Sequence, residues 1–425
     1  MEMRLGKNLV TIRRIKLYRP LDTVHGLRIL VVAPSSAFGG WQKDLDLEGE
    51  TSVTLLTARK KAKRVELLKE DSKWTLINKE GFLAVPEIAQ VDWDAVILDE
   101  STFIKNPKAK VTRFFLKHFR DVPHRWILTG MPNPETDLNF WCQLAFLDGH
   151  FMKCRSYWDF RVRHYIPGAF NDWVPKITTA DQVQKAVGMR CFIQRRKDTG
   201  MDRRVVTEVR QVELPPEIRK TYVGVENDYA LNDELETKWS VTQYSWLRQL
   251  CGGFADGDYI WTGKMQELLS LLKGELAHEP VVVWFNYNNE LHRAAKTLTE
   301  NGIMNTVLFG GVPLEERERR RQAFQSGKVR VILLQQAVAQ MGMDLSRADT
   351  AIYYSEPVSH LASRQTRDRI VNLNKNGQLL ILYLLAENTV DEDVHELVNT
   401  KRLTSGLSLS KALQHAMRRR RSSDG

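Results

Sequence analysis

The chain has 425 residues, a formal net charge of +10 at pH 7 and 43% hydrophobic residues, which is typical of a globular protein with two or three domains. No apolar run is long enough to span a bilayer and the first residues are polar, so we expect neither a membrane protein nor a secretory signal peptide. The four cysteines are scattered without a CxxC pair, which argues against a thiolate metal site and a disulfide framework.

The first eight residues, MEMRLGKN, have the pattern of the end of a phosphate-binding loop. Gly6 and Lys7 take the positions of its glycine-lysine pair, and we expect a helix to begin near Asn8. The amides at the start of that helix and the Lys7 ammonium group would together hold phosphate groups. Asn8 stands where such a loop usually has Ser or Thr, and no strand precedes the loop in this sequence.

Residues 1–200 alternate short apolar runs with longer amphipathic stretches, a pattern that predicts parallel strands separated by helices. The apolar runs are Leu27–Ala33, Trp74–Ile77, Ala95–Leu98 and Arg125–Leu128. Each run is rich in β-branched or aromatic residues and is followed by residues that favour turns. We therefore expect residues 1–200 to form one α/β domain.

Residues 201–275 form a charged stretch without a strand pattern, so we expect a helical connector there. Residues 276–400 repeat the α/β pattern and predict a second domain of the same class. Its apolar runs are Pro280–Phe285, Val329–Leu334, Thr350–Tyr354 and Gln378–Leu385. The segment Thr389–Glu392 has the pattern of a helix start. Residues 401–425 are expected to be a basic tail.

Asp99 and Glu100 directly follow one of the predicted buried strands. The end of such a strand lies at the carboxyl edge of the sheet, where open α/β folds bind ligands. Hydrolysis of a nucleotide needs one carboxylate to hold Mg²⁺ and a second one to orient the attacking water. Asp99 and Glu100 suit these two roles, although an isolated Asp-Glu pair after a strand is more often a solvated turn.

The segments around this pair resemble a known family. The sequence DE at 99–100 is followed by IKNP at 104–107 and by LTGMPN at 128–133. In this order and spacing they resemble the Swi/Snf-type branch of the superfamily-two helicases. Further segments similar to motifs of that family occur in the expected order at 31–41, 76–80, 194–197, 342–345 and 365–369.

The resemblance implies an α/β fold of two RecA-like parallel-sheet lobes of the P-loop NTPase class, joined by a helical connector. Members of the family are ATP-driven translocases on double-stranded DNA, so ATP and Mg²⁺ are the implied cofactors and DNA is the implied partner. The implied ATP-binding residues are Arg4, Leu5, Gly6, Lys7, Asn8, Asp344, Gln365 and Arg369. The implied Mg²⁺ ligands are Asp99 and Asn8.

The resemblance also assigns roles in catalysis and DNA binding. The implied catalytic residues are Glu100, Asp99, Lys7 and Arg369, with Arg369 as an arginine finger. The implied DNA-binding residues are Pro34, Ser35, Ser36, Lys105, Asn106 and Gly342, which would contact phosphates because a translocase must not depend on base sequence. Thr129 and Gly130 would couple hydrolysis to movement of the lobes.

The chain departs from the family pattern at three positions that matter for catalysis. Asn8 lacks the hydroxyl group that ligates Mg²⁺, and Arg4 replaces a smaller glycine. Asn372 stands where a second arginine is usual, unless Arg364 or Arg367 substitutes for it. Because the sequence starts inside the phosphate loop, we expect the natural product to begin further upstream.

Three functional hypotheses follow. The first is an ATP-dependent translocase on double-stranded DNA. The second is a nucleotide- and DNA-binding module of the same fold with weak or lost turnover. The third is an RNA-directed helicase, against which the IKNP segment and the long connector argue. We expect the protein in the cytoplasm, or in the host cytoplasm if it is viral; the sequence predicts no oligomeric state.

Overall fold

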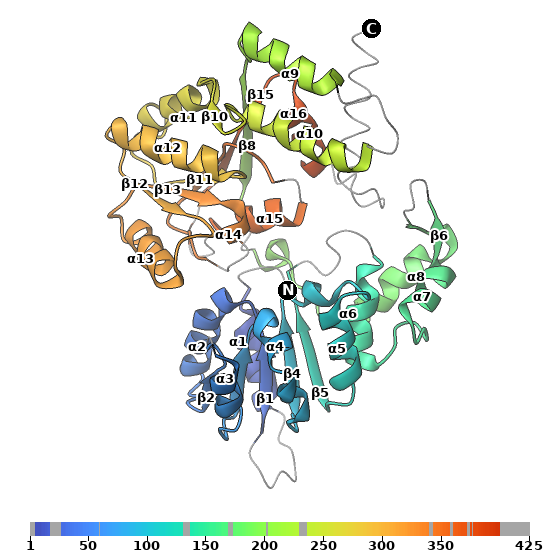
Figure 1. The fold of residues 1–425 in the computed structure, drawn as a ribbon. Coiled ribbons are helices and arrows are strands. Elements are labelled where there is room, and N and C mark those ends of the chain that lie inside the picture. Colours follow the sequence, from blue (N-terminus) through green and yellow to red (C-terminus); the bar gives the residue numbers. More distant parts are fainter. Residues whose placement is uncertain are drawn as a thin grey trace. The chain divides into compact units, whose positions relative to one another are not determined.

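The computed structural model describes residues 5–17, 27–58, 60–130, 137–168, 173–200, 203–228, 236–339, 343–357, 360–371, 375 and 377–399. The chain divides into two compact units, Met1–Met201 (unit 1) and Asp202–Gly425 (unit 2). Figure 1 shows that each unit is a sheet flanked by helices. None of the described helices combines the length and the apolar character needed to cross a membrane.

Unit 1 contains a five-stranded sheet in the order β2-β3-β1-β4-β5, in which all neighbouring strands are parallel. The strands are β1 (Ile29–Val32), β2 (Val53–Leu55), β3 (Trp74–Ile77), β4 (Ala95–Asp99) and β5 (His124–Leu128). The strands β1, β3 and β4 are buried along their whole length, and a strand buried on both faces has a continuous apolar sequence. The four strands predicted in this unit are confirmed; β2 escapes prediction because it has only three residues.

Helices cover both faces of the sheet of unit 1 (Figure 1). They are α1 (Lys7–Lys16), α2 (Phe38–Leu47), α3 (Lys61–Leu67), α4 (Lys79–Ala84), α5 (Lys110–His118) and α6 (Asn139–Asp148). The helices α7 (Tyr157–His164) and α8 (Ile177–Gly188) pack with α6 in a separate cluster beside the sheet. Successive side chains of β1 point to opposite faces: Ile29 and Val31 pack against α1 and α2, and Leu30 and Val32 against α4, α5 and α6. The small antiparallel pair β6 (Tyr165–Pro167) and β7 (Trp173–Pro175) follows α7.

Unit 2 contains a six-stranded parallel sheet in the order β12-β13-β11-β14-β15-β8. Its strands are β8 (Val205–Val212), β11 (Val281–Phe285), β12 (Asn305–Leu308), β13 (Val331–Gln335), β14 (Thr350–Tyr353) and β15 (Leu379–Ala386). Its helices are α9 (Pro216–Asp228), α10 (Glu236–Cys251), α11 (Gly263–Lys273), α12 (Asn288–Glu300), α13 (Leu314–Gln325), α14 (Gln336–Ala339), α15 (His360–Asp368) and α16 (Val390–Asn399). The four strands predicted in this unit and the predicted start of α16 are confirmed.

The expected strand-free connector over residues 201–275 is wrong in its first part. Residues 205–212 form β8, an eight-residue strand at the edge of the sheet that pairs in parallel with β15. The strand is half-exposed and carries Glu208 and Arg210, so its sequence lacks the apolar run of a central strand. In the described part of the remaining segment the structure has the helices α9, α10 and α11 and a short hairpin of β9 (Phe254–Ala255) and β10 (Asp258–Tyr259).

Several charged side chains are buried in unit 2, among them Lys264, Glu290 and Asp391. Lys264 forms an ion pair with Asp391, and the Ser355 hydroxyl donates a hydrogen bond of 2.6 Å to Oε2 of Glu290. Burial is the largest influence on Glu290 and raises the pKa of its carboxyl from 4.5 to about 7. This carboxyl group therefore changes charge near neutral pH.

Glu290→Gln is expected to make the stability of the protein less dependent on pH between 5 and 8. The folded unit keeps the proton of Glu290 up to about pH 7, whereas the unfolded chain releases it near pH 4.5. The stabilisation is therefore complete below pH 4.5 and is lost as the pH rises to about 7, a change of up to about 3 kcal/mol.

Urea denaturation of the wild type and the variant across this pH range measures the effect. Glu300→Gln at the exposed end of the same helix is the control. If the wild type and Glu290→Gln respond equally to pH, the ionisation of Glu290 does not contribute to stability.

Candidate nucleotide-binding site

The predicted phosphate loop leads directly into α1. Gly6 precedes the helix in the left-handed conformation, with φ 72° and ψ 33°, which glycine adopts with little steric cost. The Val10 amide donates to the Gly6 carbonyl at 3.0 Å and closes the first turn, and Lys7 is the first helical residue. The first amides of a helix have no acceptor within it, and the first turn of α1 contains no acidic residue. The start of α1 therefore has a positive electrostatic potential. Leu5, which precedes Gly6, is half-buried.

Contacts at its other end hold α1 in place. Ile12 and Ile15 are buried in the core beneath the sheet. Arg13 and Lys16 form ion pairs of 2.7 Å and 3.3 Å with Glu48, the residue that follows α2. These contacts fix the direction of α1 and hence the position of its first turn. Arg4, which was predicted to bind ATP, lies outside the described residues.

Asp99 is the last residue of β4 and is 5% exposed. Its Oδ2 accepts a hydrogen bond of 3.0 Å from Nε1 of Trp41, and its Oδ1 accepts one of 3.0 Å from the backbone N–H of Glu100. Burial raises the pKa of the Asp99 carboxyl above its usual range, and the bond from Trp41, the positive charge of Lys7 and the Glu100 N–H oppose this rise. Lys7 therefore lies close enough to Asp99 for its positive charge to act on the Asp99 carboxyl.

Glu100 has an uncommon backbone conformation. Its φ of 51° and ψ of 52° lie in the left-handed region, which costs a residue with a side chain roughly 1 kcal/mol or more. The short 3-10 helix η3 (Ser101–Ile104) follows immediately, and the buried Ser101 hydroxyl donates to Oε1 of Gln143 in α6 at 2.7 Å. This bond ties the segment after Glu100 to α6. Strained backbone of this kind is concentrated at functional sites.

Asn8, the other predicted Mg²⁺ ligand, contacts a neighbouring helix. Burial raises the pKa of the Asp44 carboxyl in α2, and a hydrogen bond from the Asn8 side chain opposes that rise. The amide nitrogen of Asn8 is the donor in such a bond, because a carboxylate only accepts. The Asn8 side chain thus lies close to Asp44 of α2, and its role as a metal ligand stays a prediction.

Asp99 and Lys7 together form a group that fits a magnesium nucleotide. Mg²⁺ is usually held by one or two carboxylates, with phosphate oxygens and waters as its other ligands. Asp99 supplies a buried carboxylate, and Lys7 supplies a positive charge for the phosphates. The described residues contain no group of three or more His, Cys, Asp and Glu side chains suited to a metal, so a purely protein-built site is not seen among them.

The other predicted residues of unit 1 follow three adjacent strands. Pro34 and Ser35 come after β1, Lys105 and Asn106 after β4 and η3, and Thr129 with Gly130 after β5. Since β1, β4 and β5 are parallel neighbours, these segments leave the sheet at the same edge as Asp99. Ser35 and Asn106 are exposed, and Lys105 is half-buried. The side chain of Ser36 is outside the described part of the structure.

In unit 2 the structure brings two predicted motifs together. The Leu345 amide donates to the Arg369 carbonyl at 3.1 Å, so Asp344 and Arg369 lie on adjacent segments. Oδ1 of the exposed Asp344 accepts from the Ser346 amide at 3.1 Å, which stabilises the turn. Gln365 is in α15, and Arg369 follows that helix directly. Gly342, predicted to bind DNA, and Asn372 lie outside the described residues.

Arg367, considered as a substitute for an arginine at 372, has other contacts. Its Nη2 donates to the Tyr383 hydroxyl and, at 2.6 Å, to Oδ1 of Asn399. Its guanidinium carbon lies 5.7 Å from the centre of the Tyr383 ring. These contacts join α15 to β15 and α16, so Arg367 stabilises the interior of unit 2.

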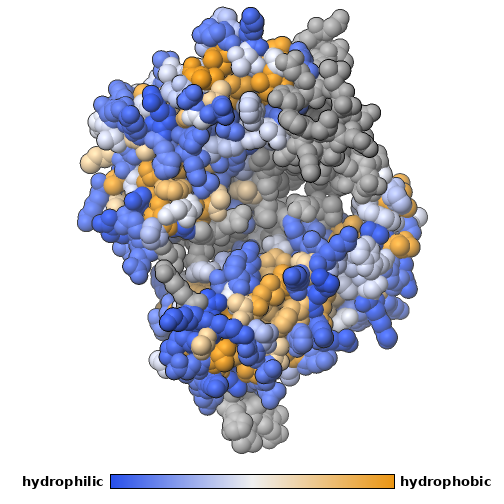
Figure 2. Space-filling model, in the orientation of Figure 1, coloured by the Kyte–Doolittle hydropathy of each residue, from blue (hydrophilic) through white to orange (hydrophobic). Residues whose placement is uncertain are grey.

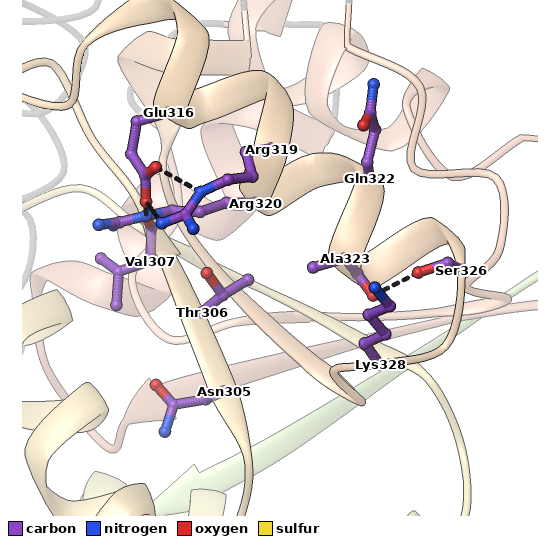
Figure 3. Close-up of a pocket in the computed structure, with 10 residues that line it drawn as sticks. All are labelled: Asn305, Thr306, Val307, Glu316, Arg319, Arg320, Gln322, Ala323, Ser326 and Lys328. Atoms are coloured by element: carbon purple, nitrogen blue, oxygen red, sulfur yellow. Dashed lines mark hydrogen bonds and ion pairs between the residues drawn. The ribbon is translucent and has the colours of Figure 1, made fainter.

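A groove of about 820 Å³ lies between β12 and α13 of unit 2 (Figure 3). The surface around α13 is largely hydrophilic (Figure 2). Both arginines that line the groove pair with the same carboxylate, because Glu316 lies 2.7 Å from Arg319 and from Arg320, so part of their positive charge is offset. None of the predicted ATP-binding residues lines this groove, so the groove is not the predicted site.

Two side chains that the sequence analysis did not assign to the site contact it directly. Trp41 belongs to the segment 31–41, which resembles a family motif. Its buried indole donates a hydrogen bond to Asp99 in the protein interior. The position of Trp41 within this motif is therefore the sequence feature that could have assigned it to the site. Gln143 binds Ser101 from 42 residues away, and no motif marks it.

Comparisons with known proteins agree with the family resemblance. Residues 1–224 match the SNF2-related domain, and residues 263–374 match the helicase conserved C-terminal domain. The solved helicase domain of Hef from Pyrococcus furiosus is similar in fold, with a TM-score of 0.50, 15% identity and 93% coverage of both chains. At this identity the likeness shows the fold alone.

Two curated relatives span most of this chain. Putative protein p41 of the Acyrthosiphon pisum secondary endosymbiont phage 1 is 24% identical over 78% of this chain and 76% of its own length. The ISWI chromatin-remodeling complex ATPase ISW1 of Saccharomyces cerevisiae is 22% identical over 94% of this chain but only 37% of its own length. Because the SNF2-related domain matches 224 of the 425 residues and a helicase C-terminal domain follows it, the chain belongs to the SNF2-related family of superfamily-two helicase-like ATPases.

Proposed function

We propose that this protein couples ATP hydrolysis to movement on double-stranded DNA. The observation that carries the proposal is the placement of Lys7, at the start of α1, in the electrostatic field of Asp99 at the end of β4. A positive helix start and a buried carboxylate at the carboxyl edge of a parallel sheet suit the phosphates of a nucleotide and its metal ion. ATP and DNA are both available inside cells, where we propose that the protein acts.

In this proposal, each residue at the carboxyl edge of unit 1 has a separate task. The amides that follow Gly6 and the Lys7 ammonium group hold the phosphates. Asp99 holds Mg²⁺, which when bound neutralises phosphate charge. Glu100 accepts a hydrogen bond from the attacking water and orients it. From unit 2, Arg369 supplies positive charge to the transferred phosphoryl group, and Asp344 and Gln365 contribute to nucleotide binding.

We further propose that the exposed segments after the strands of unit 1 bind DNA. Pro34, Ser35, Lys105 and Asn106 are at the sheet edge that carries Asp99 and Glu100, so DNA bound there would lie beside the site of hydrolysis. A relative that aligns with 94% of this chain is named as a chromatin-remodeling ATPase, which supports a DNA partner. Thr129 and Gly130, after β5, would transmit hydrolysis to movement.

A second candidate function is nucleotide and DNA binding with weak or lost turnover. The residue at position 8 favours it, because an amide there replaces the hydroxyl that usually ligates Mg²⁺, and the Asn8 side chain lies close to the Asp44 carboxyl. Asn372 also favours this second function, because it stands where the family usually has a second arginine.

Phosphate release from ATP, measured without nucleic acid, with duplex DNA and with single-stranded RNA, tests these functions. A translocase on double-stranded DNA is expected to hydrolyse ATP faster with duplex DNA than with either alternative. ATP binding without hydrolysis in the wild type, together with hydrolysis in an Asn8→Thr, Asn372→Arg double variant, would favour the binding module. Stimulation by RNA alone would contradict the choice of DNA.

A further inference from the structure

We propose that Trp41 is a positioning residue for the Mg²⁺-binding carboxylate of Asp99. The inference deepens the proposed function and rests on it, since it assumes that Asp99 is a metal ligand. The Trp41 indole sets the orientation of the Asp99 carboxylate from α2. The predicted phosphate loop leads into a different helix, α1.

The contact is a buried hydrogen bond between α2 and β4. Trp41 is fully buried, and its Nε1 lies 3.0 Å from Oδ2 of Asp99. An indole nitrogen can only donate, so the proton of this bond comes from Trp41 and the carboxylate accepts it. A hydrogen bond to a charged group in a low-dielectric interior is stronger than one between neutral groups. The bond therefore favours one orientation of the Asp99 side chain.

The second oxygen of Asp99 is also held. Oδ1 accepts the backbone N–H of Glu100 at 3.0 Å, so each carboxylate oxygen receives one N–H from the protein. Two donors in fixed directions prevent the carboxylate from rotating about its Cβ–Cγ bond. A carboxylate has about four lone-pair sites, so acceptor capacity remains for a metal ion or a metal-bound water. Fixing a ligand through its remaining oxygen contacts is the usual task of the residues behind a metal site.

A second indole in the same core shows why this arrangement is specific. Trp74 is also fully buried in the core between the sheet and α1 and α2, and its Nε1 donates to Oε2 of Glu50 at 3.1 Å. Trp74 is the first residue of β3, so its bond lies at the amino edge of the parallel sheet. Asp99 is the last residue of β4 and lies at the carboxyl edge. The two tryptophans thus have similar burial and bonding, but only the partner of Trp41 is at the edge that binds ligands.

The matched pair Trp41→Phe and Trp74→Phe tests the inference. The measurement is the binding of a fluorescent, non-hydrolysable ATP analogue during a titration with Mg²⁺, repeated in EDTA without metal. Trp41→Phe is expected to raise the Mg²⁺ concentration at half-saturation by about 10-fold or more while leaving the affinity in EDTA unchanged. Trp74→Phe is expected to leave both values as in the wild type, although each variant loses one buried hydrogen bond.

A third protein separates the N–H group from the volume of the ring. Replacement of Trp41 by 3-benzothienylalanine keeps the shape of the side chain and removes its donor, so it serves if Trp41→Phe does not fold. It is expected to reproduce the Mg²⁺ shift with a thermal unfolding midpoint close to that of the wild type. An unchanged Mg²⁺ titration in this protein would overturn the inference while leaving the proposed function intact. A wild type that binds no analogue at any Mg²⁺ concentration would overturn the proposed function and the inference with it.

Discussion

Glu100→Gln is expected to lower the DNA-stimulated rate of ATP hydrolysis by at least about 100-fold, which is the usual contribution of a residue that assists proton transfer. The glutamine side chain has nearly the same shape, so ATP affinity should stay within about twofold of the wild type. The backbone amide of residue 100, which bonds to Asp99, is present in both proteins. The expected result is therefore an enzyme that binds ATP and DNA but does not turn over.

Steady-state phosphate release and equilibrium binding of a fluorescent ATP analogue measure the two halves of this prediction. Glu87→Gln is a suitable control, because Glu87 is a glutamate of the same unit that pairs with Lys61 at 2.8 Å and precedes β4, whereas Glu100 follows it. A DNA-stimulated rate equal to that of the wild type would show that Glu100 is not the catalytic carboxylate.

Lys7→Ala is expected to lower the affinity for ATP by about 100-fold or more and, with it, the rate at low ATP concentration. This estimate corresponds to the loss of a charge-assisted hydrogen bond or two to phosphate, each worth about 1.5–3 kcal/mol. The same change should not destabilise the protein. A positive side chain at the start of a helix opposes the helix dipole by roughly 0.3–1 kcal/mol, so alanine is expected to be neutral or slightly stabilising there.

Lys16→Ala, at the opposite end of α1, is the matched control. Lys16 pairs with Glu48 and lies in the last turn, where a positive charge is favourable, so its loss should slightly lower stability and leave ATP affinity unchanged. Isothermal titration with ATP and thermal unfolding of both variants give the comparison. Equal ATP affinities for the two variants would contradict a phosphate-binding role for Lys7.

The fold class was accessible from the sequence because central parallel strands are buried on both faces. Such strands are predominantly apolar, so β1, β3, β4, β11 and β14 can be recognised from their own residues. The edge strand β8 could not be recognised in this way. It is half-exposed and mixed in polarity, and it is a strand because β15, far along the chain, supplies its hydrogen-bond partners.

The candidate nucleotide-binding site shows the same contrast between local sequence patterns and contacts with distant segments. Its principal residues occur in short motifs, and the order of these motifs along the chain indicates the family. The contacts themselves join distant segments: Trp41 reaches Asp99 over 58 residues, and Gln143 reaches Ser101 over 42. The Asn8 side chain lies close to Asp44, and the Arg367 guanidinium donates to Tyr383 and Asn399; no motif predicts these contacts.

The amino-acid sequence alone is enough to indicate the family, the α/β class and the residue types available for chemistry at each strand end. Three-dimensional packing sets the partners of those residues: the Trp41 indole donates to the Asp99 carboxylate, the Asn8 side chain lies close to Asp44 of α2, and Arg367 stabilises the interior of unit 2. The physical reason is that strand and helix patterns arise from the burial of neighbouring residues along the chain. A buried hydrogen bond depends instead on the donor that packing places beside each acceptor.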